Sequence, residues 1–445
     1  MIVMKFGGTS VGNAGAIRRV AELIIGNDPK IVVVSAMAGT TDQLESIDHF
    51  LLEGKTGEAV YLLNDIENRY LQTADELLLS DLGKKRYGSY LKEELNKIRM
   101  GFLGQAPEKR SNEIIVTGEL ITASLIFYFL KEQYIPCVLW DAADIIRLTP
   151  EGIPDMPFIT RRTSELLNNQ QGYTIFLVPG FICRDSNGRA DNLKRGGSDY
   201  SATILGAAAS VSEIQIWSDI NGLHNNDPRF VRETHTVRSL SFEEAEELAY
   251  FGAKVLHPTC IVPAKKSGIP IKLKCTFDPE AEGTLINGEA RTRGIKAIAA
   301  KDDITVITVH SDRMFQAYGF LKRIFEIFEQ YHTSVDMITT SEISVALTID
   351  DISNLDPVVG ALGALGDIEV RQAQTIICVV GDFYMNPERS ARRVLEAFNG
   401  IPVAMISFGA SKRNISLLID SSDKVKALNA LNDHLFNSMP CFARN

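Results

Sequence analysis

"MKFGGTSVGNAG" occupies residues 4–15 and follows three apolar residues. Lys5 stands just ahead of a glycine pair, Gly7-Gly8, whereas the common GxxxxGK[ST] phosphate loop has its lysine after the glycines. The stretch still predicts a strand, a flexible turn with two hydroxyl side chains, and a helix from Asn13. Backbone N–H groups in such a turn, next to a helix N-terminus, favour an anion such as phosphate. The alternative is an ordinary strand-to-helix turn with a solvated lysine.

The composition limits the class of protein. A chain of 445 residues is long enough for two or three domains. Hydrophobic residues make up 45% and charged residues 23%, as in globular proteins. The net charge of −10 speaks against nucleic acid as a partner, because phosphate contacts need a basic excess. No membrane span or signal peptide is expected, and six scattered cysteines without a CxxC pair favour the reducing cytoplasm and no zinc site.

The first part of the chain alternates strand-like and helix-like segments. Apolar, β-branched runs that predict buried strands occur at 30–39, 135–140, 173–182 and 213–219, and residues 119–133 predict a helix. This alternation predicts an α/β domain with a mainly parallel sheet covered by helices on both faces. Residues 55–112 are polar and leucine-rich, which predicts a helical excursion. Residues 275–294 contain proline and glycines and indicate the exit from a first domain over residues 1–294.

After residue 295 a pattern of strand, helix, hairpin and helix occurs twice, with a period of roughly 70 residues. Such a repeat predicts two small ferredoxin-like βαββαβ domains in tandem. We expect them at 295–374 and 375–445, with 295–303 as a strand that the second one could use. Neither repeat carries a catalytic-looking cluster, so this region is interpreted as a binding or association module.

A second glycine stretch, "LKRGGSDYSATILGAAAS", occupies residues 193–210. Arg195 precedes its glycine pair, and Asp199 falls in the first turn of the helix that follows. Two Gly-Gly loops from different crossovers of one sheet can face each other across its carboxyl edge. With Lys5 and Arg195 they would form a cradle for a triphosphate. The alternatives are that Asp199 only caps its helix and that the later "WSDINGLHNNDPRF" (217–230) is a solvated turn.

Five ordered segments resemble the signature segments of aspartate kinases: "KFGGTSV" (5–11), "TGEL" (117–120), "RGGSDY" (195–200), "NDPR" (226–229) and "FGAKVLHP" (251–258). The tandem C-terminal repeats resemble that family's ACT domains, so the resemblance covers essentially the whole chain. "GFL" (319–321) and "SVDMITTSEISVALT" (334–348) resemble the monofunctional, lysine-inhibited class. The chain ends before a fused homoserine dehydrogenase would begin, which agrees with that class.

The resemblance implies an amino-acid-kinase fold for the first domain. It implies phosphorylation of the L-aspartate side chain by ATP and Mg²⁺ to 4-phospho-L-aspartate, the first step of lysine, threonine and methionine biosynthesis. Lys5 would neutralise charge on the transferred phosphoryl group, and Asp199 would orient Lys5 or organise the metal-bound phosphates. No protein metal site is implied, because the ATP phosphates would hold most of the magnesium.

The resemblance also implies which residues contact the substrates. The implied aspartate-binding residues are Thr41, Glu119, Phe181, Arg195, Gly196, Gly197 and Ser198. The implied ATP-binding residues are Lys5, Gly7, Gly8, Thr9, Ser10, Ser218, Asp219, His224, Arg229, Lys254 and Val255. His224 departs from the family, whose members commonly have tyrosine there, and "WSD" replaces the usual "WTD".

L-lysine is the implied inhibitor, bound where first repeats of two subunits meet in a homodimer or homotetramer. The implied effector residues are Met314, Gly319, Phe320, Leu321, Ser334, Val335, Asp336 and Glu342. Gln316 and Ala317 stand where lysine-inhibited relatives often have His-Ser, so the effector and its potency stay open.

Two other functions compete with aspartate kinase. One is another amino-acid kinase, acting on glutamate, acetylglutamate or carbamate; Arg195, Glu119 and the tandem repeats speak against it. The other is a non-catalytic amino-acid sensor, against which the intact Lys5, Asp199 and both glycine loops argue.

Overall fold

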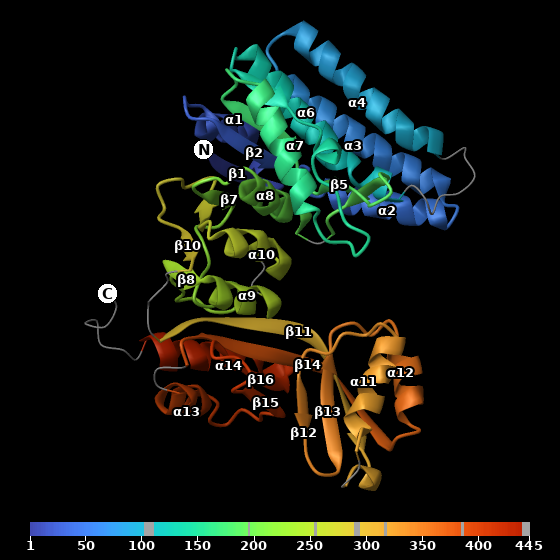
Figure 1. The fold of residues 1–445 in the computed structure, drawn as a ribbon, viewed down its shortest axis with the longest axis vertical. Coiled ribbons are helices and arrows are strands. Elements are labelled where there is room, and N and C mark those ends of the chain that lie inside the picture. The colour runs from blue at the N-terminus through green and yellow to red at the C-terminus, as the bar shows by residue number, and fades with distance from the viewer. Residues whose placement is uncertain are drawn as a thin grey trace. The chain divides into compact units, whose positions relative to one another are not determined.

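The computed structural model describes residues 1–101, 111–194, 196–252, 256–288, 294–315, 318–383 and 387–437 (Figure 1). The chain divides into two compact units. Unit 1 comprises Met1–Leu223, Arg238–Phe242 and Val255–Ala290, and unit 2 comprises His224–Val237, Glu243–Lys254 and Arg291–Asn445.

Unit 1 is built on an eight-stranded sheet with the order β3-β4-β2-β1-β7-β9-β10-β8. All neighbouring pairs are parallel except β9 and β10, which confirms the mainly parallel sheet predicted from the sequence. A short hairpin, β5 (Ile182–Arg184) and β6 (Ala190–Asn192), lies outside it. The strands of the large sheet are β1 (Ile2–Phe6), β2 (Lys30–Val34), β3 (Cys137–Leu139), β4 (Ile175–Pro179), β7 (Ile214–Ser218), β8 (Ser239–Ser241), β9 (Ile271–Cys275) and β10 (Thr284–Asn287).

β10 lies within the stretch 275–294, where the sequence indicated only an exit from the domain. Gly283, with a φ of +71°, turns the chain back so that Thr284–Ile286 pair with β9. The exit of unit 1 therefore contributes a strand to its sheet.

Helices cover both faces of this sheet because alternate strand residues point to opposite sides. Met4 and Phe6 of β1 pack into the apolar core formed by α1, α2, α3, α4 and α6. Lys5 points the other way, toward α8, which packs on β1, β2 and β7 and is itself covered by α7 and α10. The helices of unit 1 are α1 (Ala14–Ile24), α2 (Thr40–Leu52), α3 (Thr56–Leu77), α4 (Asp81–Gly101), α5 (Ser111–Ile115), α6 (Thr117–Glu132), α7 (Met156–Asn169), α8 (Gly197–Ala208) and α10 (Pro258–Ser267).

Three of these helices match sequence patterns directly. α1 begins after Asn13, whose side chain caps the helix by accepting a hydrogen bond from the Ala16 N–H at 2.9 Å. α3 and α4 form the helical excursion expected within 55–112. Among the described residues, one helical stretch, Ser111–Glu132, is long and apolar enough to cross a membrane, but 72% of its apolar window is buried inside the fold. It is therefore interpreted as a core helix.

Unit 2 contains a six-stranded antiparallel sheet with the order β12-β13-β11-β14-β16-β15. The two central strands, β11 (Ile295–His310) and β14 (Asp367–Gly381), are long and serve both repeats. The other strands are β12 (Ile338–Thr340), β13 (Ser344–Ile349), β15 (Met405–Phe408) and β16 (Asn414–Asp420). The helices are α9 (Phe242–Tyr250), α11 (Phe320–Gln330), α12 (Leu355–Leu362), α13 (Pro387–Ala397) and α14 (Lys424–Asn432), followed by a π-helical turn (Asp433–Asn437).

The two repeats of unit 2 have separate apolar cores along the shared strands. The first core combines α11 and α12 with the second half of β11, and the other combines α13 and α14 with the second half of β14. Between the halves, Asp303 and Ala373 adopt positive φ angles of 59° and 53°, and the β11–β14 register shifts near Asp303.

The Gly283 turn yields a test of the sheet. A Cβ at Gly283 would lie 2.0 Å from the Leu273 carbonyl oxygen in addition to the strain of its positive φ. Gly268 has a similar φ of +67° but open space around a Cβ. We expect Gly268→Ala to lower the free energy of unfolding by about 1–2 kcal/mol, and Gly283→Ala to cost about 1–3 kcal/mol more. Urea unfolding of both variants measures the difference, and equal losses would contradict it.

Candidate active site

A cleft of about 780 Å³ lies in unit 1 where β1 and β2 end. Four segments line most of it: the glycine turn after β1, residues 35–39 after β2, the α5–α6 region and the start of α8. The carboxyl ends of parallel strands meet at one edge of a sheet, which is where α/β proteins commonly bind ligands. The two glycine loops predicted to face each other therefore share this cleft.

Lys5 and Asp199 form an ion pair in the cleft. Their side chains, from β1 and the first turn of α8, approach to 2.7 Å and are only 11% and 14% exposed. Strand alternation directs Lys5 to the α8 side, and the position of Asp199 one turn into α8 brings the carboxylate over the sheet edge. The ion pair places the Lys5 ammonium group in the cleft, and the Asp199 carboxylate orients that ammonium group.

Glu119 supplies a second, different carboxyl group. It lies in the first turn of α6, is 3% exposed, and accepts a hydrogen bond from the Ala36 N–H. Burial raises its pKa to about 8, although the Ala36 and Glu119 N–H groups and the charge of Lys5 oppose the shift. Its Oε2 has no hydrogen-bond partner among the described residues. A buried acceptor without a partner at a cleft indicates that a ligand donor is expected there.

The start of α8 brings backbone N–H groups to the cleft. Gly196, with a φ of +73°, precedes the helix, and a Cβ at Gly197 would lie 2.3 Å from the Phe181 ring. Phe181 itself adopts a φ of +69° and donates its N–H to Ser201 Oγ at 2.9 Å. This packing leaves a helix N-terminus open to the cleft, the arrangement that attracts anions.

Most of the predicted substrate residues line this one cleft. Those present are Lys5, Gly8, Thr41, Glu119, Phe181, Gly196, Gly197, Ser198 and Asp199. Arg195, predicted to bind the substrate carboxylate, lies outside the described residues. Ser10 is fully buried and its hydroxyl lies 2.7 Å from Thr276 Oγ1, and Gly7 donates its N–H to the Trp217 carbonyl. Neither of these two, nor Thr9, lines the cleft.

The remaining predicted nucleotide residues are divided between the two units. Ser218 ends β7 in unit 1, and Asp219 beside it is exposed. In unit 2, His224 Nδ1 lies 2.8 Å from Thr234 Oγ1, and Arg229 binds Asp227 through two of its nitrogens. Lys254 and Val255 lie outside the described residues, so the nucleotide site stays a prediction.

Several lining residues did not stand out in the sequence. Residues 35–39, directly after β2, are the longest run of lining residues that the sequence did not indicate, and Asn112 and Asn192 contribute amide groups to the cleft. The signal was available in "SAMAG" (35–39), a stretch directly after a buried strand in which every residue but Met37 is small. Small residues at the carboxyl edge of a sheet leave room for a ligand. The missed lining residues are Ser35, Ala36, Met37, Ala38, Gly39, Asp42, Glu45, Asn112, Ile115, Asn192 and Lys194.

Comparison with known proteins identifies the family. A family model of the amino acid kinase family matches residues 1–275, and an ACT domain model matches residues 377–435. The chain is 30% identical to lysine-sensitive aspartokinase 3 of Escherichia coli (strain K12), over 98% of this chain and 99% of that protein. The chain belongs to the aspartokinase family. It is also 31% identical to chloroplastic aspartokinase 2 of Arabidopsis thaliana, over 98% of this chain and 85% of that one.

Solved aspartokinase structures share the fold. The crystal structure of E. coli aspartokinase III in complex with aspartate and ADP (R-state) has a TM-score of 0.87 at 30% identity, covering 98% of this chain and 100% of that chain. The structure of the same enzyme with lysine and aspartate (T-state) has a TM-score of 0.79, covering 98% and 99%. An amino-acid-kinase domain followed by a C-terminal ACT domain, as expected from the sequence, is thereby confirmed.

In unit 2, one carboxylate predicted to meet an aspartokinase effector already contacts an ammonium of this chain. The side chain of Asp336 is 2% exposed, and its Oδ1 lies 2.8 Å from Lys301 Nζ and accepts a hydrogen bond from the Tyr250 hydroxyl at 2.8 Å. Lys301 also lies 2.8 Å from Asp350 Oδ2 and above the Tyr250 ring. An incoming ammonium group would therefore have to share Asp336 with Lys301.

The other predicted effector residues lie around α11 and the β12–β13 hairpin. Gly319 caps α11 with a φ of +79°, and Phe320 is buried in the first core, against which Met314 and Val335 pack. Leu321 is 39% exposed, and Ser334 and Glu342 are exposed. Gln316 and Ala317 lie outside the described residues.

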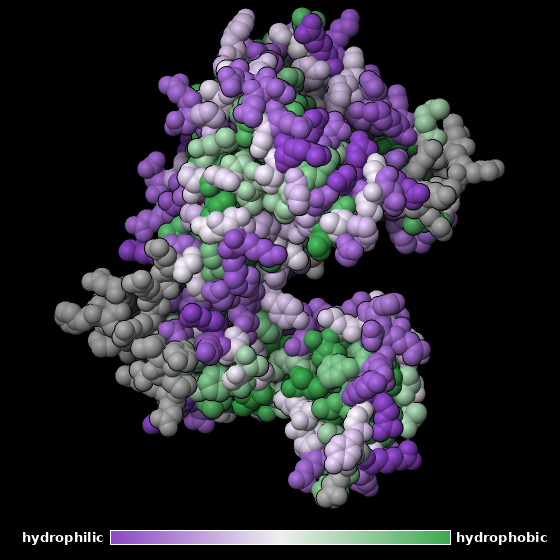
Figure 2. Space-filling view, in the orientation of Figure 1, coloured by the Kyte–Doolittle hydropathy of each residue, from purple (hydrophilic) through white to green (hydrophobic). Residues whose placement is uncertain are grey.

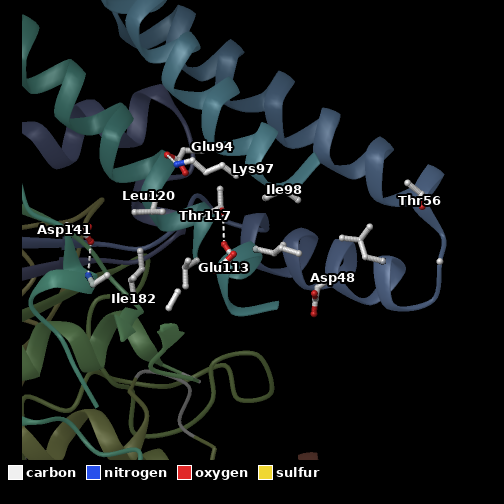
Figure 3. Close-up of a pocket in the computed structure, with 16 residues that line it drawn as sticks. Asp48, Thr56, Glu94, Lys97, Ile98, Glu113, Thr117, Leu120, Asp141 and Ile182 are labelled. Carbon is white, nitrogen blue, oxygen red and sulfur yellow. Dashed lines mark hydrogen bonds and ion pairs between the residues drawn. The ribbon is translucent and has the colours of Figure 1, made fainter. Parts of the chain in front are cut away.

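A second cavity of about 460 Å³ lies in unit 1 between α2, α4, α5 and α6 (Figure 3). Its wall contains an ion pair between Lys97 and Glu94, at 2.7 Å, and the apolar Leu120. None of the residues predicted for catalysis or substrate binding lines it. α5 and α6 separate the two spaces, with Glu119 in the wall of the cleft and Thr117 in that of the second cavity.

The raised pKa of Glu119 predicts a pH dependence of stability. Between its unfolded value of 4.5 and its folded value of about 8, the folded protein retains a proton that the unfolded chain has released. Raising the pH through this window therefore lowers the free energy of unfolding, by up to about 1.4 kcal/mol per pH unit. We expect urea unfolding to show this loss in the wild type relative to Glu119→Gln, which cannot ionise. A difference between the two proteins that stays constant from pH 5 to 8 would contradict the assignment.

Proposed function

We propose that this protein phosphorylates the side-chain carboxylate of L-aspartate with ATP. The observation that carries the proposal is the cleft in which the Lys5–Asp199 pair, the open start of α8 and the unpartnered Glu119 oxygen converge. Relatives named aspartokinase match almost the whole chain, and the E. coli enzyme is solved with aspartate and ADP in complex.

Phosphoryl transfer needs positioning and charge stabilisation more than covalent chemistry from the protein. Lys5 would contact the transferred phosphoryl group and stabilise the charge on its oxygens in the transition state. Asp199 would keep the Lys5 ammonium pointed into the cleft. Backbone N–H groups near Gly8 and at the start of α8 would add donors to the phosphates.

Recognition of aspartate requires one protein group for its α-ammonium group and another for its α-carboxylate. Glu119, once ionised, would pair with the α-ammonium group, whose arrival lowers the pKa of the carboxyl group. Arg195 would bind the α-carboxylate through its planar fork. Thr41, Phe181 and Ser198 would complete the pocket, leaving the side-chain carboxylate directed toward Lys5.

Mg²⁺ would neutralise charge on the ATP phosphates. In nucleotide sites it binds mainly through phosphate oxygens with one or two protein carboxylates. Among the described residues, no group of three or more His, Cys, Asp and Glu side chains could hold a metal ion. Asp199, beside Lys5, is the carboxylate we expect to contact it.

We further propose the division of labour expected from the sequence, with residues 1–294 catalytic and 295–374 and 375–445 regulatory. Figure 2 shows apolar side chains on the surface of unit 2, and exposed apolar residues on its outer strands include Ile338, Ile406 and Phe408. These support self-association through the repeats into a homodimer or homotetramer, which light scattering would measure. Five described cysteines are free and buried, in keeping with the cytoplasm.

The activity is tested by an ATP- and Mg²⁺-dependent hydroxamate assay, in which hydroxylamine traps the acyl phosphate. We expect product with L-aspartate and far less with L-glutamate or N-acetylglutamate. ADP release with carbamate covers the remaining amino-acid-kinase alternative. A protein that binds amino acids but turns none of them over would instead be a sensor.

The role of Lys5 predicts a specific kinetic loss. Lys5→Ala should lower kcat on the order of 10²-fold or more, because a preorganised charge at the phosphoryl group is lost. Lys30→Ala is the matched control: Lys30 is also buried, at the start of β2, but its Nζ binds the Ile24 carbonyl away from the cleft. Near-normal kcat in Lys5→Ala, or an equal loss in Lys30→Ala, would reject the assignment.

L-lysine is proposed as the inhibitor. Support comes from the E. coli relative, which is named lysine-sensitive and is solved with lysine and aspartate. Asp336 Oδ2 is buried without a hydrogen-bond partner among the described residues, so this carboxylate retains an acceptor for the effector despite Lys301.

We expect rising L-lysine to inhibit the wild type, and Asp336→Ala to require at least about tenfold more lysine, since a buried charged pair is lost. Asp351→Ala removes a fully exposed acid from the same unit and should leave inhibition unchanged. Wild-type activity that ignores saturating lysine, with no lysine binding by calorimetry, would reject lysine as the effector.

A further inference from the structure

The segment after β2 contacts two other parts of the cleft. Ala36 donates its N–H to Glu119, and Ala38 donates its N–H to the Gly8 carbonyl at 3.1 Å. Residues 36–40 thus connect the carboxyl group proposed for the substrate ammonium with the glycine turn proposed for phosphate. Residues 36–39 lie between β2 and α2, outside regular secondary structure, so the side chains that bind this segment contribute to its conformation.

Two adjacent residues of α3 hold this segment. Arg69 donates to the Ala38 carbonyl at 2.7 Å and to Thr40 Oγ1 at 2.9 Å. The Tyr70 hydroxyl accepts from the Met37 N–H at 3.3 Å, and Thr122 Oγ1 accepts from the same N–H at 3.1 Å. α3 belongs to the helical excursion, to which the sequence analysis assigned no function.

The hydroxyl groups that contact this segment form a chain of hydrogen bonds, and the donor in each bond can be derived. Thr122 donates its only proton to the Gly118 carbonyl at 2.8 Å, so at 2.7 Å it accepts from Tyr70. Tyr70 has then used its proton and accepts from Thr40, at 3.1 Å. Thr40 in turn accepts from Arg69, which can only donate.

This chain runs from the Arg69 guanidinium to the carbonyl of Gly118, the residue before Glu119. Thr40, Tyr70 and Thr122 are all fully buried, so a lost member leaves a polar group without water to replace its partner. In this arrangement each of the three hydroxyl groups, those of Thr40, Tyr70 and Thr122, donates its proton to the next member of the chain.

We infer that Arg69 and Tyr70 are positioning residues of the active site, which hold residues 36–40 in the conformation that forms the aspartate-binding wall of the cleft. Neither side chain lines the cleft, so they act through the backbone they bind. The inference rests on the proposed function, because its readout is the affinity for aspartate.

The test is Tyr70→Phe, which removes one oxygen and keeps the ring. We expect the KM for aspartate to rise about tenfold, as for the loss of a buried hydrogen bond. The kcat and the KM for ATP should stay within about twofold. Arg69→Met should act in the same direction, and the double variant should lose less than the product of the two effects, because both residues act on one segment.

Tyr87→Phe is the matched control. Tyr87 is also a fully buried tyrosine of the helical excursion, and its hydroxyl donates to the Ile121 carbonyl at 3.2 Å rather than to a group of residues 36–40. We expect it to lower the melting temperature comparably to Tyr70→Phe while leaving the KM for aspartate unchanged.

Two results would overturn the inference: equal KM values for aspartate in Tyr70→Phe and Tyr87→Phe, or a parallel rise in the KM values for aspartate and ATP. If the wild type itself fails to phosphorylate aspartate, the proposed function is wrong instead. The two failures are therefore distinguishable.

Discussion

The ion pair between Lys5 and Asp199 is the interaction on which the arrangement of unit 1 depends. It joins the end of β1 to the first turn of α8, and its 2.7 Å separation requires β1 and α8 to pack closely. A lysine with so little exposure is tolerated because a carboxylate compensates its charge. The small residues of α8 and the glycines before it allow this close packing. The same residues that make the helix fit the sheet therefore also leave its N-terminus free for an anion.

The cleft combines two electrostatic environments within one cavity. Lys5 and Asp199 form an ion pair, whereas burial raises the pKa of Glu119 to about 8 and so favours its neutral form. A perturbed pKa of this kind in a cleft is characteristic of functional sites. A substrate ammonium group would complete the environment of Glu119, so binding and ionisation of this residue are linked.

Most of the fold of unit 1 could be predicted from the sequence, because the alternation of strands and helices and the glycine pairs are local patterns. They predicted the mainly parallel sheet, the helix after Asn13 and two glycine loops that share one edge of the sheet, whereas the placement of Asp199 beside Lys5 was implied by the family resemblance. The role of residues 36–40 was not predictable in this way, since Tyr70 in a leucine-rich helix has the pattern of an ordinary core residue. The contact of Lys301 with Asp336 was equally hidden, because it depends on how β11 and the following hairpin align. Long-range polar contacts of this kind leave no periodic trace.

The sharing of β11 and β14 between the two repeats has a consequence for synthesis on the ribosome. Ile298 in the first half of β11 pairs with Val379, which the chain reaches only after the whole first repeat, whereas Ile307 pairs with Val370. A nascent chain that ends after α12 therefore has half a strand with no partner, an exposed edge of the type that promotes aggregation. The pairings of the first repeat, between β12, β13, the second half of β11 and the first half of β14, are all available by residue 374. The first half of β11 instead waits for the second half of β14, so the second repeat depends on a strand made before the first repeat.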